Sequence, residues 1–456
     1  MNSTKPAPNP MEEVEQMLTA PDTAHLAAFL ERIGPAETAR MVSRLSVDDR
    51  NRLLTLLDPH KAAEVIEDVP EAQAVGLIES LPPQEAAHIV DEMHSDVQAD
   101  VLGDLHEQDA EAILEQMDPQ EAAEARQLMA YEPDTAGGLM VTEYLAYDQH
   151  RAVSDVLTDL RTHHAAYADY DVQYVYVIDT DRLLIGVLRM RDMLFAPPSA
   201  SLERVMIRDV LSVRANDTVD QLTGFFDHHN LFGAPVVNND GVLVGIVQRS
   251  AVAAATVKEA DHRFLGISGI VGGEEFRSMP TWVRSGRRLS WLSINIVLNI
   301  IAASVIAVYQ DTLSAVIALA VFLPMISDMS GCSGNQAVAV SMRELTLGLV
   351  RAGELARVAW KEAVVGVING CVLGLLLGLA ALAWKGNPTL GLVVGAALAV
   401  NTIVAVTIGG LLPLIMKGLR LDPALVSGPI LTTVTDMCGF FLVLSLATAV
   451  LPQLVT

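Results

Sequence analysis

Five apolar runs in the second half of the chain are each long enough to cross a bilayer, and they constrain the fold more than any other feature. A hydrocarbon core of about 30 Å requires about 20 predominantly apolar residues in a helix. The runs cover residues 289–309, 313–342, 363–384, 389–415 and 424–451. They predict a five-helix α transmembrane domain over residues 282–456, with the lipid bilayer as its solvent.

The charged residues separate at about residue 280. Residues 281–456 hold 7 acids and 10 bases, whereas residues 1–280 hold 48 acids and 20 bases. The first part therefore has a net charge of −28. Nucleic acid is excluded as its partner because phosphate contacts need a basic surface. Cations are the natural counterpart of such an acidic surface.

Basic residues alternate between the ends of the apolar runs. They lie before the first run, between the second and third, and between the fourth and fifth, at Arg284, Arg287, Arg288, Arg343, Arg351, Arg357, Lys361, Lys417 and Arg420. By the positive-inside rule these loops are cytoplasmic. The opening residues lack the apolar segment of a cleaved signal peptide. We therefore expect a multi-pass protein of the cell inner membrane with a cytoplasmic N-terminus and an exoplasmic C-terminus.

An internal repeat precedes the apolar half. An apolar residue returns every twelve positions, at Ile33, Leu45, Leu57, Val69, Leu81, Met93, Leu105, Met117 and Met129. Each unit has room for a helix of about two turns and a corner. Asp58-Pro59 and Asp118-Pro119 are typical helix starts. Because short helices bury little alone, they are expected to stack. The pattern predicts an acidic α-superhelical domain over residues 21–131, after a disordered tail of residues 1–20.

The period changes to that of strands after about residue 134. Two copies of a strand, a turn and a strand follow, each after a helical stretch. The strands lie at residues 175–179 and 184–188 in the first copy, and at 235–238 and 243–247 in the second. This tandem α/β pattern resembles a pair of cystathionine-β-synthase-type (CBS) domains, which we place at residues 132–250. Such domains commonly sense ligands.

The nucleotide signature of CBS domains is incomplete here. It has a glycine, two hydrophobic residues, Ser or Thr, and an aspartate three residues further on. The corresponding residues are Gly186, Arg189 and Asp192 in the first copy, and Gly245, Gln248 and Ala251 in the second. The first copy has half of the signature and the second copy lacks it, so nucleotide binding is not expected.

Polar groups interrupt two of the apolar runs. Asp436 lies near the middle of the fifth, where a carboxylate costs about 2.5–3.5 kcal/mol and is by default a functional-site candidate. Thr432 and Gly428 share its helical face. The alternative is a neutral, hydrogen-bonded packing residue. In the second run, residues 323–336 contain a proline, two glycines and several polar side chains. They predict a break in the helix, which membrane depth tolerates only when protein or a wet cavity covers it.

A carboxylate beside polar side chains and glycine carbonyls suits a hard cation that prefers oxygen ligands. Magnesium keeps most of its water, so one or two carboxylates with carbonyl groups are sufficient. No lysine or arginine lies deep in the runs to attract an anion. We therefore select Asp436 as the metal ligand. The candidate pore-lining residues are Asp328, Gly331, Cys332, Gly334, Asn335 and Thr432.

The order of the parts, together with three motifs, resembles the MgtE family of magnesium channels. The motifs are residues 132–140 at the domain junction, 330–336 in the second run and 422–436 in the fifth. The resemblance implies a homodimer with the pore on its two-fold axis, where two copies of Asp436 face one hydrated Mg²⁺ ion. Cys332 stands where the family has an asparagine, and Cys438 stands where threonine is common.

The resemblance also implies a connecting, or plug, helix, which we place at residues 251–281. In the family this helix is rich in acids that bind regulatory magnesium. Here residues 248–262 retain only Glu259 and Asp261, which we take as candidate cation-sensing residues. We therefore expect most cation sensing to fall on the repeat domain and its contact with the CBS pair.

The sequence as a whole predicts a homodimeric divalent-cation channel for Mg²⁺ uptake, gated by its cytoplasmic acidic domain and CBS pair. It holds no nucleophile and base pair, phosphate loop or zinc motif that would indicate an enzyme. Three alternatives remain open. They are a transporter of another divalent metal such as Co²⁺, Mn²⁺ or Ni²⁺, a transporter of an anion or organic solute, and a non-conducting membrane-anchored sensor.

Overall fold

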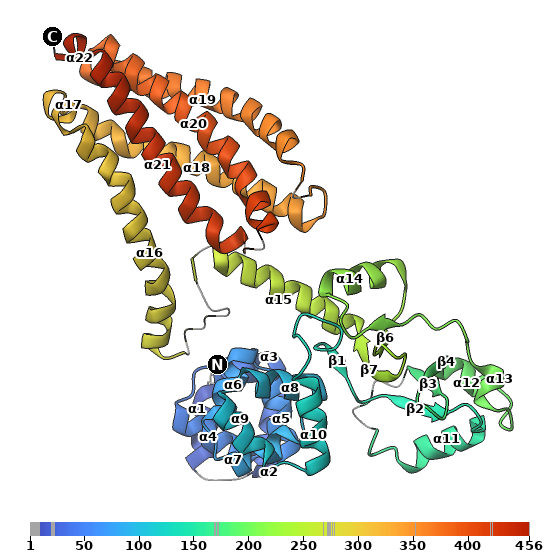
Figure 1. Ribbon diagram of the computed structural model, residues 1–456. Helices are drawn as coiled ribbons and strands as arrows, with labels where there is room; N and C mark the ends of the chain where they lie inside the picture. Colours follow the sequence, from blue (N-terminus) through green and yellow to red (C-terminus); the bar gives the residue numbers. More distant parts are fainter. Residues whose placement is uncertain are drawn as a thin grey trace, which may run out of the picture. The chain divides into compact units, whose positions relative to one another are not determined.

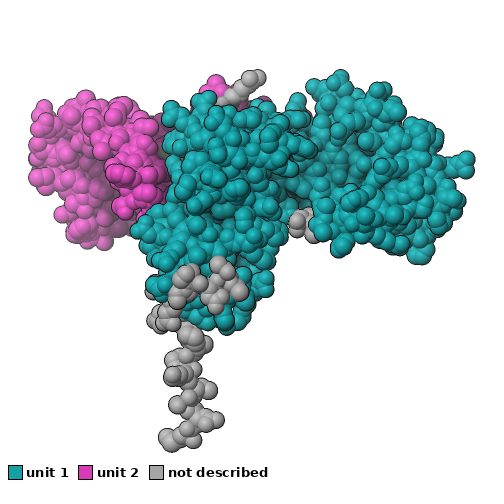
Figure 2. Space-filling model, turned by 90° about the horizontal axis from the view of Figure 1, so that it is seen from below, with its two compact units in different colours: residues 1–259 teal, residues 260–456 magenta. Residues whose placement is uncertain are grey.

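The computed structural model describes residues 10–19, 23–167, 170, 173–267, 269–270, 275, 277, 279–351, 353–419, 421 and 423–455. They divide into two compact units, residues 1–259 and residues 260–456, which Figure 2 colours teal and magenta. Each unit is described by itself.

Unit 1 begins with a stack of short helices, drawn in blue to teal in Figure 1. They are α1 (Pro10–Thr19), α2 (Thr23–Ile33), α3 (Pro35–Val42), α4 (Val47–Leu56), α5 (Pro59–Glu67), α6 (Glu71–Glu79), α7 (Pro83–Val90), α8 (Ser95–Asp104), α9 (Glu107–Leu114) and α10 (Pro119–Leu128). The repeated apolar residues occupy the corners and pack into one continuous core. Proline opens α3, α5, α7 and α10, where its missing N–H has no intrahelical partner to lose. The predicted helical domain is therefore present.

The start of the chain differs from the prediction of a disordered tail over residues 1–20. Residues 10–19 form α1, and its Val14 and Leu18 are 0% and 1% exposed in the same core as the repeats. These two residues are four positions apart and share one helical face, so the repeat core can bury them. Residues 1–9 and 20 lie outside the described part of the chain.

Two small sheets follow in unit 1. Their strands are β1 (Met140–Val141), β2 (Leu145–Asp148), β3 (Tyr174–Ile178), β4 (Leu184–Arg189), β5 (Val213–Arg214), β6 (Gly233–Val237) and β7 (Leu243–Gln248). The helices between them are α11 (Val153–Thr162), α12 (Met190–Phe195), α13 (Leu202–Val205) and α14 (Val219–His228). The strand orders are β2-β3-β4 and β1-β7-β6-β5. Each copy has an antiparallel hairpin with a parallel strand beside it, as a tandem CBS fold requires.

Helix α15 (Arg249–Ile267) leaves the second sheet directly after β7 and contains the boundary between the two units. It is shorter than the predicted connecting helix of residues 251–281, because the described residues between 269 and 280 are not helical. Glu259 and Asp261 both lie on α15. Residues two positions apart do not share a helical face, so these two carboxylates diverge.

Unit 2 is a helical bundle. It consists of α16 (Thr281–Val308), α17 (Gln310–Ala315), α18 (Leu319–Thr346), α19 (Leu355–Lys385), α20 (Pro388–Gly418), α21 (Pro423–Ala449) and α22 (Leu451–Val455). Within the described residues, α16, α19, α20 and residues 428–449 of α21 are long and apolar enough to cross a membrane. The remaining predicted span, the second apolar run, corresponds to α18, which has more polar residues. Helix α20 packs against α18, α19 and α21, so it is the centre of the bundle.

The predicted break in the second apolar run is wrong. Helix α18 is continuous from Leu319 to Thr346, with Pro324 inside it. Serine hydroxyls in the polar segment donate to carbonyls of their own helix, from Ser330 to Ile326 at 2.7 Å and from Ser333 to Met329 at 3.1 Å. The hydroxyl groups are therefore satisfied without unwinding the helix, and α20 and α21 cover its other side.

Candidate functional site

Asp436 lies in the middle of α21, at the contact between this helix and α18. Its side chain is 8% exposed, and the hydroxyl of Ser327 on α18 donates a hydrogen bond to its Oδ1. One carboxylate is thus held between two helices by a neutral donor. The predicted site residue is therefore brought to a helix interface rather than to the outer surface of the bundle.

A buried polar group lies directly beside this carboxylate. Ser330 of α18, Asn401 of α20 and Thr435 of α21 are each 0% exposed. The Nδ2 atom of Asn401 donates to Ser330 Oγ at 2.6 Å and to the Thr435 backbone carbonyl at 3.0 Å. Sequence reasoning missed Asn401 and Ser327. For Asn401 a signal existed, because it is the one amide side chain in the apolar run 389–415.

The remaining predicted pore residues form two groups. Asp328, Cys332 and Asn335 are exposed in the isolated chain, and their spacing of four and three residues places them on one stripe of α18. Thr432, also exposed, lies one turn before Asp436. The second group is packed between helices. It consists of Gly334, where an added Cβ would lie 3.0 Å from the Ala405 carbonyl oxygen of α20, and Gly331, where an added Cβ would lie 3.9 Å from Thr435 Oγ1 of α21.

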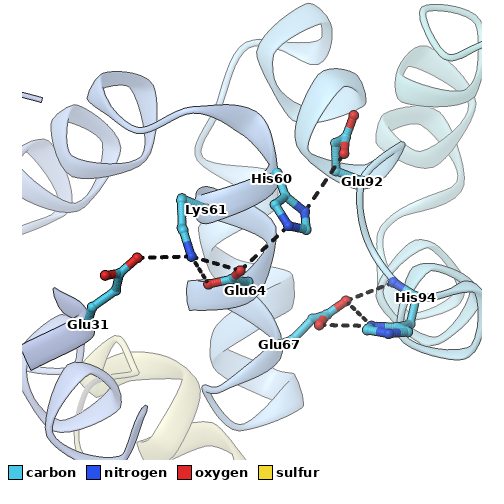
Figure 3. A network of polar contacts seen from close by, with 7 residues as sticks. All are labelled: Glu31, His60, Lys61, Glu64, Glu67, Glu92 and His94. Atoms are coloured by element: carbon cyan, nitrogen blue, oxygen red, sulfur yellow. Dashed lines mark hydrogen bonds and ion pairs between the residues drawn. The ribbon is translucent and has the colours of Figure 1, made fainter. Parts of the chain in front are cut away.

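The structure of unit 1 shows a second polar centre, in the repeat domain (Figure 3). His60 lies between Glu64 and Glu92, with nitrogen-to-oxygen distances of 3.6 and 3.9 Å. Beyond them, the Glu67 carboxylate accepts hydrogen bonds from the backbone N–H of His94 at 2.7 Å and contacts its ring Nδ1 at 3.0 Å. The hydrogen bond with Glu67 raises the pKa of His94 to about 9.

These residues border an acidic pocket of about 470 Å³ between the repeat domain and the start of the CBS pair. Its lining residues are His60, Glu64, Glu67, Asp91, Glu92, Met93, His94, Gln120, Glu121, Glu124, Thr142, Glu143 and Tyr170. Burial, with nearby carboxylates adding to it, raises the pKa of Glu121, and burial also raises that of Asp91. The pocket thus holds carboxylates whose negative charge is incompletely balanced by protein groups.

The pocket is closed on one side by a direct contact between the two domains of unit 1. Glu143, just after β1, accepts hydrogen bonds from the backbone N–H of Ser95 at 3.0 Å and from its hydroxyl at 2.8 Å. Ser95 Oγ accepts one from the Thr142 N–H at 2.9 Å. Because Ser95 begins α8, the Glu143 carboxylate also lies at a helix N-terminus, which favours a negative charge.

A further group of acids lies beside Lys258 of the connecting helix α15. Lys258 of α15 forms an ion pair with Glu71 of α6, close to Asp100 and Asp104 of α8. Burial, together with the charge of Glu71, raises the pKa of Asp100 to about 7. Across the described ranges, no three His, Cys, Asp or Glu side chains are grouped closely enough to hold a metal ion by themselves.

The raised pKa of His94 predicts a pH response of the repeat domain. The value in the folded state, about 9, lies above the ordinary value of 6.5. The pairing with Glu67 therefore stabilises α8 fully below pH 6.5, and this contribution is lost as the pH rises through about 9. We expect His94→Gln to increase proteolysis near α8 at neutral pH, and the difference from the original chain to vanish above pH 9.

His106 is the matched control, because it stands twelve residues later at the same helix-start position, before α9. His106→Gln should leave proteolysis unchanged over the same pH series. Equal effects of the two substitutions would show that the ion pair with Glu67 contributes nothing.

Comparison with known proteins gives matches along most of the chain. Residues 323–446 match the family model MgtE, described as a divalent cation transporter, residues 33–134 match the MgtE intracellular N domain, and residues 202–258 match the CBS domain. A magnesium transporter MgtE of Thermus thermophilus is 33% identical over 329 residues, which are 71% of this chain and 72% of the relative. That of Bacillus subtilis is 31% identical over 327 residues, 72% of each chain.

Two solved structures resemble about half of this chain. One is the soluble part of a magnesium transporter, with 23% identity and a TM-score of 0.50, covering 55% of this chain and 98% of that one. The other is the cytosolic domain of the Mg²⁺ channel MgtE in complex with ATP, with 31% identity and a TM-score of 0.49, covering 54% and 99%. The first likeness supports the fold of unit 1.

Proposed function

Since the chain belongs to the MgtE family of divalent cation transporters, we propose that it is a homodimeric Mg²⁺ channel in which the ion passes Asp436. As a member of that family it is a membrane transporter and not an enzyme. The observation that carries the proposal is the buried Asp436 carboxylate between α18 and α21, beside an exposed polar stripe on α18.

The exposed stripe is the reason for a second copy. Asp328, Cys332 and Asn335 would face lipid if unit 2 stood alone in a bilayer, and lipid offers polar groups no hydrogen bonds. A second α18 across a two-fold axis would cover this stripe and enclose water between the two polar faces. On this proposal α18 also crosses the membrane, which brings the number of spans to five, the N-terminal unit is cytoplasmic and the C-terminus is exoplasmic.

Two Asp436 carboxylates facing each other would suit a hydrated divalent ion. Magnesium gives up its water reluctantly and is typically bound by one or two carboxylates, with waters completing its octahedron. A paired site would therefore attract the ion without stripping it. Co²⁺, Mn²⁺ and Ni²⁺ are the second candidates, and Cys332 favours them because thiolate ligands prefer softer ions than magnesium.

The cytoplasmic unit is proposed to gate the channel in response to divalent cations. The acidic pocket at the contact of the repeat and CBS domains is the supporting observation, because its charge is relieved when a cation binds. Glu259 and Asp261 of α15 stay secondary candidates, since they diverge on the helix. Nucleotide binding stays unexpected from the incomplete signature at Gly186 and Gly245.

Flux into proteoliposomes tests the transport function directly. The full-length protein should admit Mg²⁺ down a concentration gradient, and parallel assays with Co²⁺, Mn²⁺ and Ni²⁺ should rank the ions. Divalent flux no higher than in empty vesicles would favour the non-conducting sensor. Preference for a softer ion over Mg²⁺ would favour the second candidate.

Cysteine accessibility tests the position of the pore. Cys332 and Cys371 are both exposed in the isolated chain, but Cys332 lies on the polar stripe of α18 and Cys371 on α19. The test uses variants that keep one of these two thiols. A charged methanethiosulfonate reaches a thiol only through water, so it should modify Cys332 and reduce flux by about tenfold. The reagent should spare the variant that keeps only Cys371. Equal modification of both would contradict the pore assignment.

Cys332 also allows a test of ion selectivity. If Cys332 acts as a soft ligand, Cys332→Asn should lower the flux of Co²⁺ relative to that of Mg²⁺ in the competing-ion assay. An unchanged ratio would leave packing as the role of this thiol.

A further inference from the structure

Asn401 connects three helices at the centre of the membrane domain. Its side chain on α20 is 0% exposed, and its two amide N–H groups donate to Ser330 Oγ of α18 and to the Thr435 carbonyl of α21. A carbonyl can only accept a hydrogen bond, so the Nδ2 atom has to face Thr435. This contact fixes the orientation of the amide.

The other end of the amide is unsatisfied. Asn401 Oδ1 is buried and has no hydrogen-bond partner among the described residues. A buried acceptor without a partner destabilises a fold, and an apolar side chain of similar shape would avoid that penalty. The amide is therefore a poor choice for stability alone. What it provides is a pair of donors aimed at two different helices.

Both helices that Asn401 holds contribute to the surroundings of Asp436. Thr435 immediately precedes Asp436 on α21. On α18, Ser330 accepts from Asn401 and contacts the backbone carbonyl of Ser327 at 3.1 Å, and the Ser327 hydroxyl donates to the Asp436 carboxylate. Asn401 is thus linked to Asp436 through the backbone of α21 on one side, and through Ser330 and Ser327 of α18 on the other.

Close packing holds the Asn401 amide in place. A Cβ atom added to Gly439 of α21 would lie 2.7 Å from Asn401 Nδ2 and 3.3 Å from Ile326 Cγ2 of α18. The three helices therefore meet with no room for a shift of the amide. Because the Asn401 amide contacts α21 one residue before Asp436 and three residues after it, the amide restricts rotation of this part of α21 about its axis.

We propose that Asn401 is a positioning residue for the ion site and sets its preference for Mg²⁺ over larger divalent cations without touching the ion. This inference rests on the proposed function of Asp436 as the ion ligand. Magnesium demands near-ideal octahedral geometry, whereas Ca²⁺ accepts a flexible set of oxygen ligands. A carboxylate released from its fixed position should lose Mg²⁺ transport more than Ca²⁺ transport.

Asn401→Leu removes both donors and the unsatisfied acceptor while keeping a branched side chain. In proteoliposomes of the full-length protein we expect Mg²⁺ flux to fall about tenfold, as for other residues that orient metal ligands. The ratio of Mg²⁺ to Ca²⁺ flux should also fall, while the thermal unfolding temperature of the purified protein is kept or raised. Ser330→Ala, which removes the acceptor on α18, should lower the same ratio, and the double variant should be no worse than Asn401→Leu.

Thr402→Val is the control, because Thr402 is also 0% exposed but its hydroxyl bonds to the Leu398 carbonyl of its own helix. It should keep both flux and ion ratio. If Asn401→Leu and Ser330→Ala retain the original ratio of Mg²⁺ to Ca²⁺ flux, the proposal is overturned. This holds even if flux and unfolding temperature both fall, because the amide would then serve the fold alone. An unchanged flux for Asp436→Asn would instead remove the proposed ion site itself.

Discussion

Asp436→Ala is expected to abolish divalent-cation flux while the protein remains folded. Asp436→Asn should retain weak flux, lower by about tenfold or more, because it keeps an acceptor for the Ser327 hydroxyl but loses the charge. The measurement is Mg²⁺ uptake into proteoliposomes that contain equal amounts of each variant. Size-exclusion chromatography and thermal unfolding report whether the fold is kept.

The physical reason is the energetic cost of the carboxylate. A charge near the centre of a bilayer is unfavourable by about 2.5–3.5 kcal/mol on insertion scales. In the structure Ser327 gives it one neutral hydrogen bond, which does not replace a counter-charge. A bound cation supplies the missing counter-charge. The presence of Asp436 at this depth is therefore best explained by ion binding. Removing the carboxylate should therefore leave the stability of the bundle unchanged or raise it.

Asp311→Asn is the matched control, since Asp311 is an exposed acid of unit 2 on the short helix α17. It should transport at the original rate. Undiminished uptake by Asp436→Ala would exclude Asp436 as the ion ligand. A loss of flux with loss of the folded protein would instead support the alternative that this residue serves packing.

Sequence periodicity predicts most of the fold of unit 1. The twelve-residue spacing predicts the corners because each corner buries its apolar residue in the common core, as Leu45 and Leu57 do. The strand pairs of the CBS copies follow from alternation, and the structure pairs them as hairpins. Periodicity is reliable here because local burial alone determines these elements.

The errors have a different origin. The composition of residues 323–336 predicts a helix break, but their serine hydroxyls bond to carbonyls one turn earlier and keep α18 continuous. Asn401 escapes sequence reasoning because its importance depends on two helices that are distant in sequence. Val14 and Leu18 resemble part of a tail because their partners lie in later repeats. Composition cannot supply such tertiary contacts.

Millimolar Mg²⁺ on the side of the membrane that holds residues 1–280 is expected to protect these residues from limited proteolysis and to reduce channel current. These residues carry a net charge of −28, so the like charges repel one another in a compact arrangement. The raised pKa values of Asp91 and Glu121 show that ionised carboxylates are also locally unfavourable in the compact state, because burial disfavours their ionised forms. A bound divalent ion relieves this repulsion, and it shifts the equilibrium only if it binds the compact state more tightly.

The direction of these pKa shifts determines how pH affects the compact state of residues 1–280. Carboxyl groups whose folded-state pKa is raised stabilise the compact state less as the pH rises through their titration range. Mild acidification should therefore act in the same direction as Mg²⁺ and also protect residues 1–280. Sodium at equal ionic strength should act weakly, because screening between groups inside a pocket is less effective than binding.

The double variant Glu121→Gln/Glu124→Gln removes two carboxylates that line the acidic pocket, and it should reduce the Mg²⁺ response of both cleavage and current roughly twofold or more. Glu107→Gln/Glu115→Gln changes the net charge equally on exposed positions at the start and end of α9, outside the residues that line the pocket. If both pairs reduce the response equally, total charge rather than the pocket controls gating. If the original chain responds to Mg²⁺ in neither assay, unit 1 is not a magnesium sensor, and the pocket needs another ligand to explain its uncompensated charge.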